Sequence, residues 1–358
     1  MLENYKRVIA SIIVITVLIV IELVLLTYQR SSQLHNEELA KSIPKSKTDK
    51  VSFLAFGDIN LGRSVGQKIL KKGIDFPFEK YNVQLDSADI VFANLECSVS
   101  FQNGETGDPN HNLIFTAPPE AAMTLYHAGI HIVSTANNHA LDYGYKALGE
   151  TIDNLKRVNI LHVGTSNIEK TLFDPLIIEK NNIKIAIFGV TSFVNIALKG
   201  WKKSIASPDT VILKRRIAQI RDSVDVVIMS YHGGVEYIDS PIKKVRDFGE
   251  WCINNDVDIF LGHHPHVTFG VEKKGKQFIV HSLGNFIFFQ PQHYWTQRSY
   301  GLKFVFEKND STTKVDVQRF FPINVSMQTK RLTDSIEIKK LFTRTQKLSN
   351  FDLTQYWN

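Results

Sequence analysis

Residues 51–58 read VSFLAFGD, an apolar run of β-type residues that ends on an aspartate. Five more stretches repeat this form, each with Glu, Asn or His at or just past the end of an apolar run: 90–96 IVFANLE, 132–139 IVSTANNH, 226–232 VVIMSYH, 259–266 IFLGHHPH and 278–285 FIVHSLGN. Open α/β sheets bind ligands in the crevice outside the carboxyl ends of their strands. Because these side chains are metal-ligand types, the six stretches together predict one metal centre at a sheet edge.

The rest of the chain shows the alternation typical of an α/β fold. Apolar, β-branched runs predict strands at 51–56, 88–93, 130–136, 183–190, 224–230, 257–262, 277–282 and 302–307. Apolar residues at helical spacing predict helices at 145–159, 209–223, 243–255 and 335–348. Residues 102–112, QNGETGDPNHN, are dense in turn formers and predict a loop over the site.

Bulk composition limits the class of protein. Of 358 residues, 43% are hydrophobic and 22% are charged, as in ordinary globular proteins. The net charge of +6 is compatible with an anionic substrate or surface but requires neither. The sequence contains no recognisable nucleic-acid motif, so nucleic acid is not expected as a partner. Cys97 and Cys252 lie in separate segments, and no disulfide framework is predicted.

The first 50 residues differ from the rest of the chain. Residues 8–28, VIASIIVITVLIVIELVLLTY, contain one charged side chain and as a helix would span roughly 30 Å, the thickness of a bilayer's hydrocarbon layer. A cleaved signal peptide would have a shorter apolar region and a small-residue cleavage site, which this chain lacks. Flanking charges do not decide the orientation of the segment. We therefore predict a membrane anchor at 1–30, a polar linker at 31–50, one folded domain at 51–325 and a helical tail at 326–358.

Two carboxylates follow the first two predicted strands. Asp58 lies in GDINLGR, where the glycine lets the carboxylate turn into the crevice; alternatively Asp58 caps the next helix. Glu96 in NLE is placed to bridge two cations, or else it begins a helix. Arg63, five residues after Asp58, can clamp a phosphate or carboxylate oxygen, or lie on the surface. None of these residues defines a site by itself.

The histidine-containing stretches carry the stronger signals. In ANNHALDYG an asparagine oxygen can ligate a metal, His139 can act as general acid or anion clamp, and Asp142 can orient its ring. The three histidines of GHHPH are hard to explain by packing, and two of the rings can address neighbouring metal positions. A lone histidine such as His232 is more often a satisfied core residue. The remaining candidates are Glu236 and Tyr237 for substrate contact, and His281 and Asn285 in HSLGNF.

In this order the motifs GDINLGR, NLECSV, STANNHALDYG, HGGVEY, LGHHPHV and HSLGNFIF resemble those of the CapA family, from about residue 51 to 290. That family comprises capsule and poly-γ-glutamate synthesis proteins related to the calcineurin-like metallophosphatases. The resemblance implies a metallophosphatase-like two-sheet sandwich flanked by helices, in an extracytoplasmic domain that follows one transmembrane helix. Carried over by motif, it implies a catalytic-type His139 and these metal ligands: Asp58, Glu96, Asn138, His232, His264 and His266.

Several positions depart from the metallophosphatase pattern. Those enzymes open with D-x-H, whereas Asn60 stands at the third position here, and Glu96 in NLE replaces GDxxD. One metal position would then have only Asp58, Glu96 and His266, which leaves open positions for water. We therefore expect one or two divalent transition ions (Mn, Fe or Zn). HGG in place of the commoner HWG, and His281 in place of a tyrosine, would alter the substrate cleft.

Three functions are compatible with the sequence, and the residues leave open whether the chain is an enzyme. The first is a metal-dependent hydrolase acting on an anionic extracellular polymer, with His139 protonating the leaving group. The second is a non-catalytic polymer-binding or export component of a membrane synthase, with other membrane subunits as partners. The third is a generic extracytoplasmic metallophosphoesterase. The expected substrate contacts are Arg63, Glu236, Tyr237 and Asn285.

Overall fold

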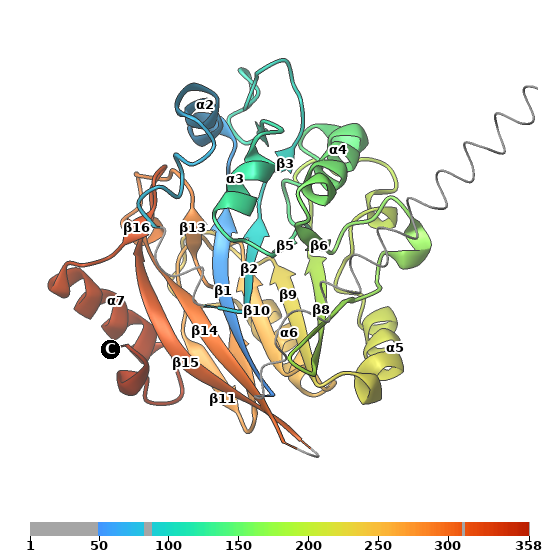
Figure 1. Ribbon diagram of the computed structural model, residues 1–358, viewed down its shortest axis with the longest axis vertical. Coiled ribbons are helices and arrows are strands. Elements are labelled where there is room, and N and C mark those ends of the chain that lie inside the picture. Colours follow the sequence, from blue (N-terminus) through green and yellow to red (C-terminus); the bar gives the residue numbers. More distant parts are fainter. Residues whose placement is uncertain (1–48, 82–87, 310–311, 358) are drawn as a thin grey trace, which may run out of the picture. The chain divides into compact units, whose positions relative to one another are not determined.

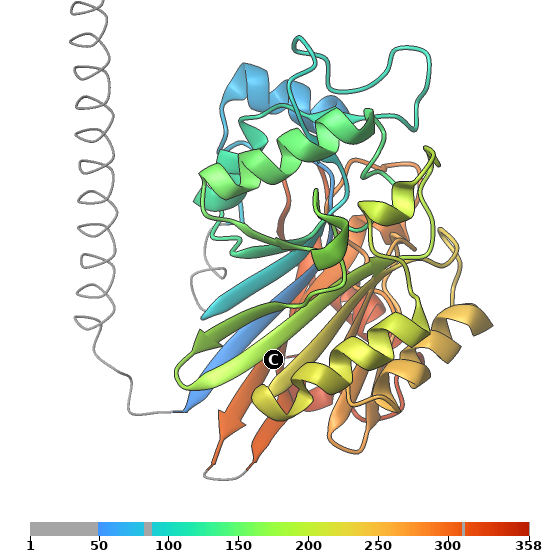
Figure 2. The same ribbon diagram turned by 90° about the vertical axis from the view of Figure 1, so that its right-hand side faces the viewer.

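Two β-sheets packed face to face, with helices on their outer faces, form the part of the chain that the structure describes (Figures 1 and 2). This computed structural model describes residues 49–81, 88–309 and 312–357. The predicted membrane anchor at 1–30 lies outside the described residues. Among the residues that are described, no helix is both long enough and apolar enough to cross a bilayer.

The first sheet is mixed, with strands in the order β16-β15-β14-β1-β2-β5-β6 and a short strand, β13, paired with β1. Neighbours β1, β2, β5 and β6 are parallel, whereas β14, β15 and β16 run antiparallel to their partners. The bounds of these strands are β1 Lys50–Ile59, β2 Ile90–Leu95, β5 Ile132–Ser134, β6 Leu161–Val163, β13 Asn285–Ile287, β14 Arg298–Lys308, β15 Thr313–Asn324 and β16 Lys330–Arg331.

The second sheet is also mixed, in the order β11-β12-β10-β9-β8-β7. Its four central strands are parallel, and the edge strands β7 and β11 are antiparallel to their neighbours. The bounds are β7 Leu176–Lys180, β8 Ile183–Thr191, β9 Val226–His232, β10 Ile259–His263, β11 Val271–Lys274 and β12 Gln277–Val280. A separate two-stranded sheet pairs β3 Ser98–Val99 with β4 Thr116–Ala117.

The helices cover the outer faces of both sheets, as Figure 2 shows in side view. Helices α2, α3 and α4 pack on the first sheet, and α5 and α6 pack on the second. The bounds are α2 Arg63–Lys72, α3 Ala121–His127, α4 Gly144–Arg157, α5 Thr210–Ile220, α6 Lys243–Ile253 and α7 Ser335–Lys347. Short 3-10 turns lie at Glu169–Thr171, Trp201–Lys203, Arg221–Ser223, Trp295–Gln297 and Thr354–Tyr356.

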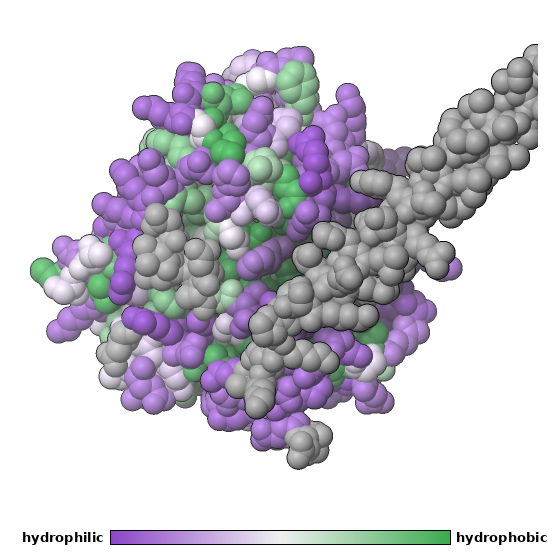
Figure 3. Space-filling model, in the orientation of Figure 1, coloured by the Kyte–Doolittle hydropathy of each residue, from purple (hydrophilic) through white to green (hydrophobic). Residues whose placement is uncertain are grey.

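Alternation along β1 explains how one strand serves two cores. Val51, Phe53 and Ala55 face the second sheet, whereas Leu54 and Phe56 face the helices on the other side. Successive side chains of a strand point to opposite faces, so a strand buried on both faces is apolar throughout. All five side chains are fully buried. The surface in Figure 3 is by contrast mainly hydrophilic, with scattered hydrophobic residues.

The sequence-based prediction of an α/β fold is confirmed, with every predicted strand and helix present within a few residues. The loop predicted at 102–112 is also present. The prediction missed α2, α3 and several strands, among them β6, β7, β11 and β15; in β15 charged and amide side chains interrupt the apolar pattern. After α7 the chain returns to the inter-sheet core, where Leu353 is fully buried and Trp357 stacks on Phe320 at a ring distance of 5.0 Å.

Candidate metal centre

The carboxyl ends of strands from both sheets bring the predicted ligands to one place. Asp58 lies near the end of β1, Glu96 directly follows β2, and His232 is the last residue of β9. Parallel pairing sets Asp58 opposite Asn94, and His232 opposite His263. Three overlapping groups have donor atoms within 4.8 Å of one another: Asp58, Glu96 and His266; Glu96, His232 and His264; and Glu236, His264 and His266.

The Glu96 carboxylate lies at the centre of this cluster. It is fully buried, and neither oxygen has a hydrogen-bond partner among the described residues. Its Oε1 is 3.7 Å from His232 Nε2, 3.7 Å from His266 Nε2 and 3.9 Å from His139 Nε2. These separations exceed hydrogen-bond length, and they are close to the spacing of about 3.4 Å between ligands around an ion with bonds of about 2.1 Å.

Burial, then the charge of Asp58, raises the pKa of Glu96 well above its usual range. Without a cation the carboxyl would therefore hold a proton, because a buried charge without a partner is costly. A divalent cation would reverse this preference, since metal ligands bind in their deprotonated form. Imidazole nitrogens and carboxylate oxygens are donors that transition metals accept. The residues present therefore fit a divalent transition metal.

Asp58 is held in place and ionised. Its Oδ1 accepts a hydrogen bond from Asn94 Nδ2 at 2.8 Å, and its Oδ2 accepts one from the backbone N–H of His264 at 3.1 Å. Burial alone would raise the pKa of Asp58, but His263 and His266, each 3.4 Å away, hold it well below the usual value. The second anionic ligand is thus available without a change of protonation.

Asn138 and His232 form a second part of the cluster. His232 Nε2 lies 2.7 Å from Asn138 Oδ1, and its Nδ1 lies 3.1 Å from Asn94 Nδ2. Burial, together with the nearby His264, lowers the pKa of His232 well below its usual value. The neutral imidazole is the form that binds a metal.

His264 and His266 follow β10 on backbone with φ of +97° and +58°. Such conformations are uncommon for residues other than glycine and cluster at functional sites. Burial and the neighbouring His266 lower the pKa of His264 to about 4, so its ring is neutral at neutral pH. His266 Nδ1 lies 2.9 Å from Asn285 Oδ1, which leaves Nε2 towards Glu96.

His139 stands beside the cluster in an oriented position. Its Nδ1 lies 2.7 Å from Asp142 Oδ2, which also accepts the backbone N–H of Phe115 at 3.0 Å. The ring stacks on Phe115 at a centroid distance of 4.0 Å. Burial raises the pKa of Asp142. His139 Nε2 therefore faces the cluster, while Asp142 holds the other nitrogen.

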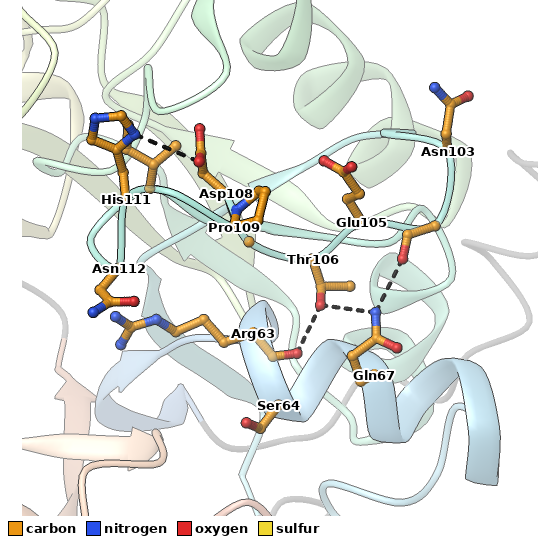
Figure 4. Close-up of a pocket in the computed structure, with 13 residues that line it drawn as sticks. Arg63, Ser64, Gln67, Asn103, Glu105, Thr106, Asp108, Pro109, His111 and Asn112 are labelled. Carbon is orange, nitrogen blue, oxygen red and sulfur yellow. Dashed lines mark hydrogen bonds and ion pairs between the residues drawn. The ribbon is translucent and has the colours of Figure 1, made fainter.

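Arg63 lies at the start of α2, next to the loop predicted over the site. Its guanidinium lies over the outer face of the Phe115 ring at 5.0 Å, and within the described residues it makes no hydrogen bond or ion pair. The backbone of Arg63 is tied to Thr106 of the loop by two hydrogen bonds, 2.6 and 2.8 Å long. Arg63 lines a cavity of about 540 Å³ between α2 and residues 103–114 (Figure 4).

The other predicted substrate contacts lie in two different surroundings. Glu236 has a carboxylate oxygen within 4.8 Å of His264 and His266 nitrogens. Tyr237 accepts a hydrogen bond from Gln290 at 3.1 Å, and burial and the adjacent Glu236 raise the pKa of its phenol. Asn285 is fully buried and binds His266, Gln290 and the backbone of Thr296. Its contacts favour a role in orienting His266 rather than in contacting substrate.

Sequence reasoning missed several residues of the site. Asn94 contacts both Asp58 and His232 through its side-chain nitrogen. It lies two residues before Glu96, inside the apolar run, and was not among the predicted site residues. Asn195 contacts Asn138 and both nitrogens of His139 from a loop after β8, and no strand-end pattern marks it. Asn60, at the position where D-x-H enzymes have histidine, accepts the backbone N–H of Gly62 at 2.8 Å. His281 binds Glu272 of β11 at 2.7 Å.

One protein-family model and two capsule-biosynthesis relatives match most of this chain. The family model described as bacterial capsule synthesis protein PGA_cap matches residues 52–290. The capsule biosynthesis protein CapA of Bacillus anthracis is 28% identical over 92% of this chain and 81% of that protein. The PGA biosynthesis protein CapA of Bacillus subtilis is 28% identical over 86% of this chain and 82% of its own length.

Solved structures are more distant. A 5′-nucleotidase precursor from Thermus thermophilus aligns with 83% of this chain and 59% of its own, at 11% identity and a TM-score of 0.45. The sulfate thiohydrolase SoxB of the same genus aligns with 80% and 46%, at 11% identity and a TM-score of 0.43. The assignment rests on the family model, which covers most of the described domain. The chain belongs to the bacterial capsule synthesis protein PGA_cap family.

Proposed function

We propose that this chain is a metal-dependent hydrolase-type component of capsule or poly-γ-glutamate biosynthesis, acting on an anionic extracellular polymer. The observation that carries the proposal is the buried Glu96 carboxylate, without a hydrogen-bond partner and surrounded by imidazole nitrogens at 3.7–3.9 Å. The names of the Bacillus relatives, which refer to capsule and PGA biosynthesis, support the choice of polymer.

One or two divalent transition ions (Mn, Fe or Zn) would be held by six residues: Asp58, Glu96, Asn138, His232, His264 and His266. When bound, such an ion lowers the pKa of a coordinated water and polarises the group to be cut. The ionised Asp58 and the neutral His232 and His264 present these ligands in binding form. Glu96, whose pKa is raised by burial, would have to be deprotonated on binding.

His139 would supply the proton for the leaving group. Asp142 holds Nδ1 of its ring at 2.7 Å, so the tautomer and orientation are set and Nε2 points to the cluster. A general acid held in this way contributes about 10²- to 10⁴-fold to rate. Arg63 and Tyr237, at the edge of the cluster, would bind the anionic groups of the polymer on either side of the bond that is cut.

A non-catalytic role in polymer binding or export is the second candidate. It is favoured by the Arg63 guanidinium, which makes no hydrogen bond or ion pair among the described residues and borders an open cavity. In this case the bound metal would hold a carboxylate of the polymer. Membrane synthase subunits would be the partners of this protein. Under either proposal residues 1–30 anchor the chain in the membrane, and the folded domain lies outside the cytoplasm.

Metal content and polymer production test the proposal together. The full-length chain, purified without chelators, is expected to contain at least one equivalent of a transition metal by plasma mass spectrometry. His139→Ala should retain that metal, because His139 lies beside the ligand set, and should abolish polymer-related activity in a strain that lacks the native protein.

The outcomes separate the two candidates. Less than one equivalent of metal in the unmodified chain would overturn both. Normal polymer production by His139→Ala, with metal retained, would exclude the hydrolase and leave the binding role. As a matched control, His281→Ala removes a buried histidine that is hydrogen-bonded to Glu272 and belongs to none of the donor groups, and it should leave polymer production intact.

A further inference from the structure

One face of α7 carries a row of cationic side chains that the proposed reaction does not use. The row consists of Lys339, Lys340, Arg344 and Lys347, with the neutral Thr343 between them, and the spacing of three and four residues places these side chains along one side of the helix. At 1.5 Å per residue this row extends over about 12 Å. It lines a groove of about 700 Å³ whose one acidic lining residue is Asp239.

One guanidinium nitrogen of Arg344, in the wall of this groove, has no hydrogen-bond partner among the described residues. Its Nη1 donates to Asp239 at 2.8 Å and its Nε to the Thr268 carbonyl at 3.3 Å. Its Nη2 is buried and has no hydrogen-bond partner among the described residues. The side chain is 11% exposed, and a guanidinium nitrogen in that position is costly to leave unpaired. Lys339 and Lys347 are exposed and, unlike Arg344, make no ion pair within the described residues.

Apolar side chains form the rest of the groove. Trp295 lies under the Arg344 guanidinium at 4.8 Å, and Ile336 and Leu348 line the wall. Ile336 is 66% exposed and adds apolar surface to this wall. In Figure 3 the α7 region, at the left, mixes hydrophobic with hydrophilic side chains. A ligand with both charged groups and methylene groups would match this lining.

Two loops connect the groove to the metal centre. Asp239 is two residues from Tyr237, whose neighbour Glu236 has a carboxylate oxygen within 4.8 Å of His264 and His266 nitrogens. The second loop carries Trp295 into the groove and stacks His293 on Tyr237 at 4.2 Å. The same loop accepts a hydrogen bond from Asn285, the partner of His266. A flexible chain bound in the groove could therefore reach the cluster along Tyr237.

We propose that the α7 groove is a second binding site for the same polymer, holding a polycarboxylate chain at a distance from the metal centre. This inference rests on the proposed function and adds a site to it. The regularly spaced carboxylates would pair with Lys339, Arg344 and Lys347, and the methylene groups would pack on Trp295. A membrane surface is the poorer match, because a planar bilayer does not fill a concave groove.

Charge reversal tests the groove. The full-length chain is titrated against a fluorescent poly-γ-glutamate oligomer, and binding is followed by anisotropy. We expect Lys339→Glu/Lys347→Glu to raise Kd about tenfold or more, since two attractive contacts become repulsive. The control is Lys214→Glu/Arg215→Glu on α5, which makes the same change of net charge at two exposed positions outside the groove. It should shift Kd by less than about twofold.

Equal changes in both double variants, or no change in either, would overturn the proposal, as would failure of the unmodified chain to bind the oligomer. The proposal would also be overturned if Lys339→Glu/Lys347→Glu lost binding to phosphatidylserine vesicles but still bound the oligomer. That result would assign this face of α7 to a membrane. Trp295→Ala gives a second reading without changing charge, and its Kd should also rise. Metal content and His139-dependent polymer production, measured on the same variants, show separately whether the proposed function holds.

Discussion

Two histidine–carboxylate pairs in this protein have the same hydrogen-bond length but different surroundings. His139 and Asp142 are joined at 2.7 Å beside the metal centre, and His281 and Glu272 at 2.7 Å on β11 and its neighbouring segment. Burial raises the pKa of Asp142, whereas the hydrogen bond from His281 lowers the pKa of Glu272. Glu272 also has Lys274 at 3.5 Å.

The difference lies on the far side of each imidazole. The other nitrogen of His139 is 3.9 Å from the unpaired Glu96 carboxylate, in the middle of the ligand cluster. The other nitrogen of His281 is buried without a hydrogen-bond partner among the described residues, and His281 belongs to none of the donor groups. A histidine–carboxylate pair is therefore not evidence of a site by itself. A functional pair also needs metal-ligand groups close to the other imidazole nitrogen.

The largest effect is expected at Glu96, on which this distinction depends. Glu96→Gln should remove most of the bound metal, because an amide replaces the anionic ligand shared by two donor groups. Without metal its stability should match that of the unmodified chain, because the raised pKa keeps Glu96 neutral there. The unmodified chain should gain about 3–4 kcal/mol when free metal exceeds Kd by about 100- to 1,000-fold. Thermal unfolding with and without chelator checks this, and a variant that still gains stability with metal would show that Glu96 is no ligand.

The next effect compares the two pairs directly. Asp142→Asn should reduce polymer-related activity about 100-fold, because the asparagine no longer fixes the tautomer of His139. Glu272→Gln makes the same chemical change in the other pair and should leave that activity within about twofold. Activity assays on both variants at equal metal content decide the matter. Equal losses in the two variants would contradict a special role for the His139 pair.

A smaller effect is expected behind His266. Asn285→Ala should weaken metal affinity about 10- to 100-fold, since residues that orient a ligand have effects of this size. Metal titration of the apo chain measures the change, and circular dichroism verifies that the buried site is still folded. If metal affinity is unchanged while KM for the polymer rises, Asn285 contacts substrate instead.

The smallest effect concerns stability and pH. The pKa of Glu272 is lowered in the folded chain, so its pairing stabilises the fold above the unfolded pKa of 4.5 and this contribution is lost as pH falls through the folded pKa. Glu272→Gln should therefore cost about 1 kcal/mol or less at pH 7, since the carboxylate is partly exposed, and less at pH 3. Urea unfolding at both pH values measures this difference. If the loss of unfolding free energy is as large at pH 3 as at pH 7, it arises from packing and not from the charge of Glu272.

Much of the fold could be read from local patterns. The apolar run of 51–56 predicted a strand, and in the structure both faces of β1 meet a core. The histidines of GHHPH suggested a metal centre because three imidazoles in four residues are hard to explain by packing, although His263 is buried near Phe92 and belongs to none of the donor groups. Helix α2 was missed because the glycine at its N-cap, Gly62, and Gly66 in its first turn reduce its helical signal.

The sequence by itself determined which side chains stand at strand ends, because a strand's direction and alternation are local properties. Only the tertiary structure decided what each of them does. Parallel pairing across β1 and β2 sets Asn94 against Asp58, and the approach of the two sheets brings His232 and His266 to Glu96. Those distances join residues far apart in the chain, so no local pattern encodes them. A tertiary contact likewise directs Asn285 to His266.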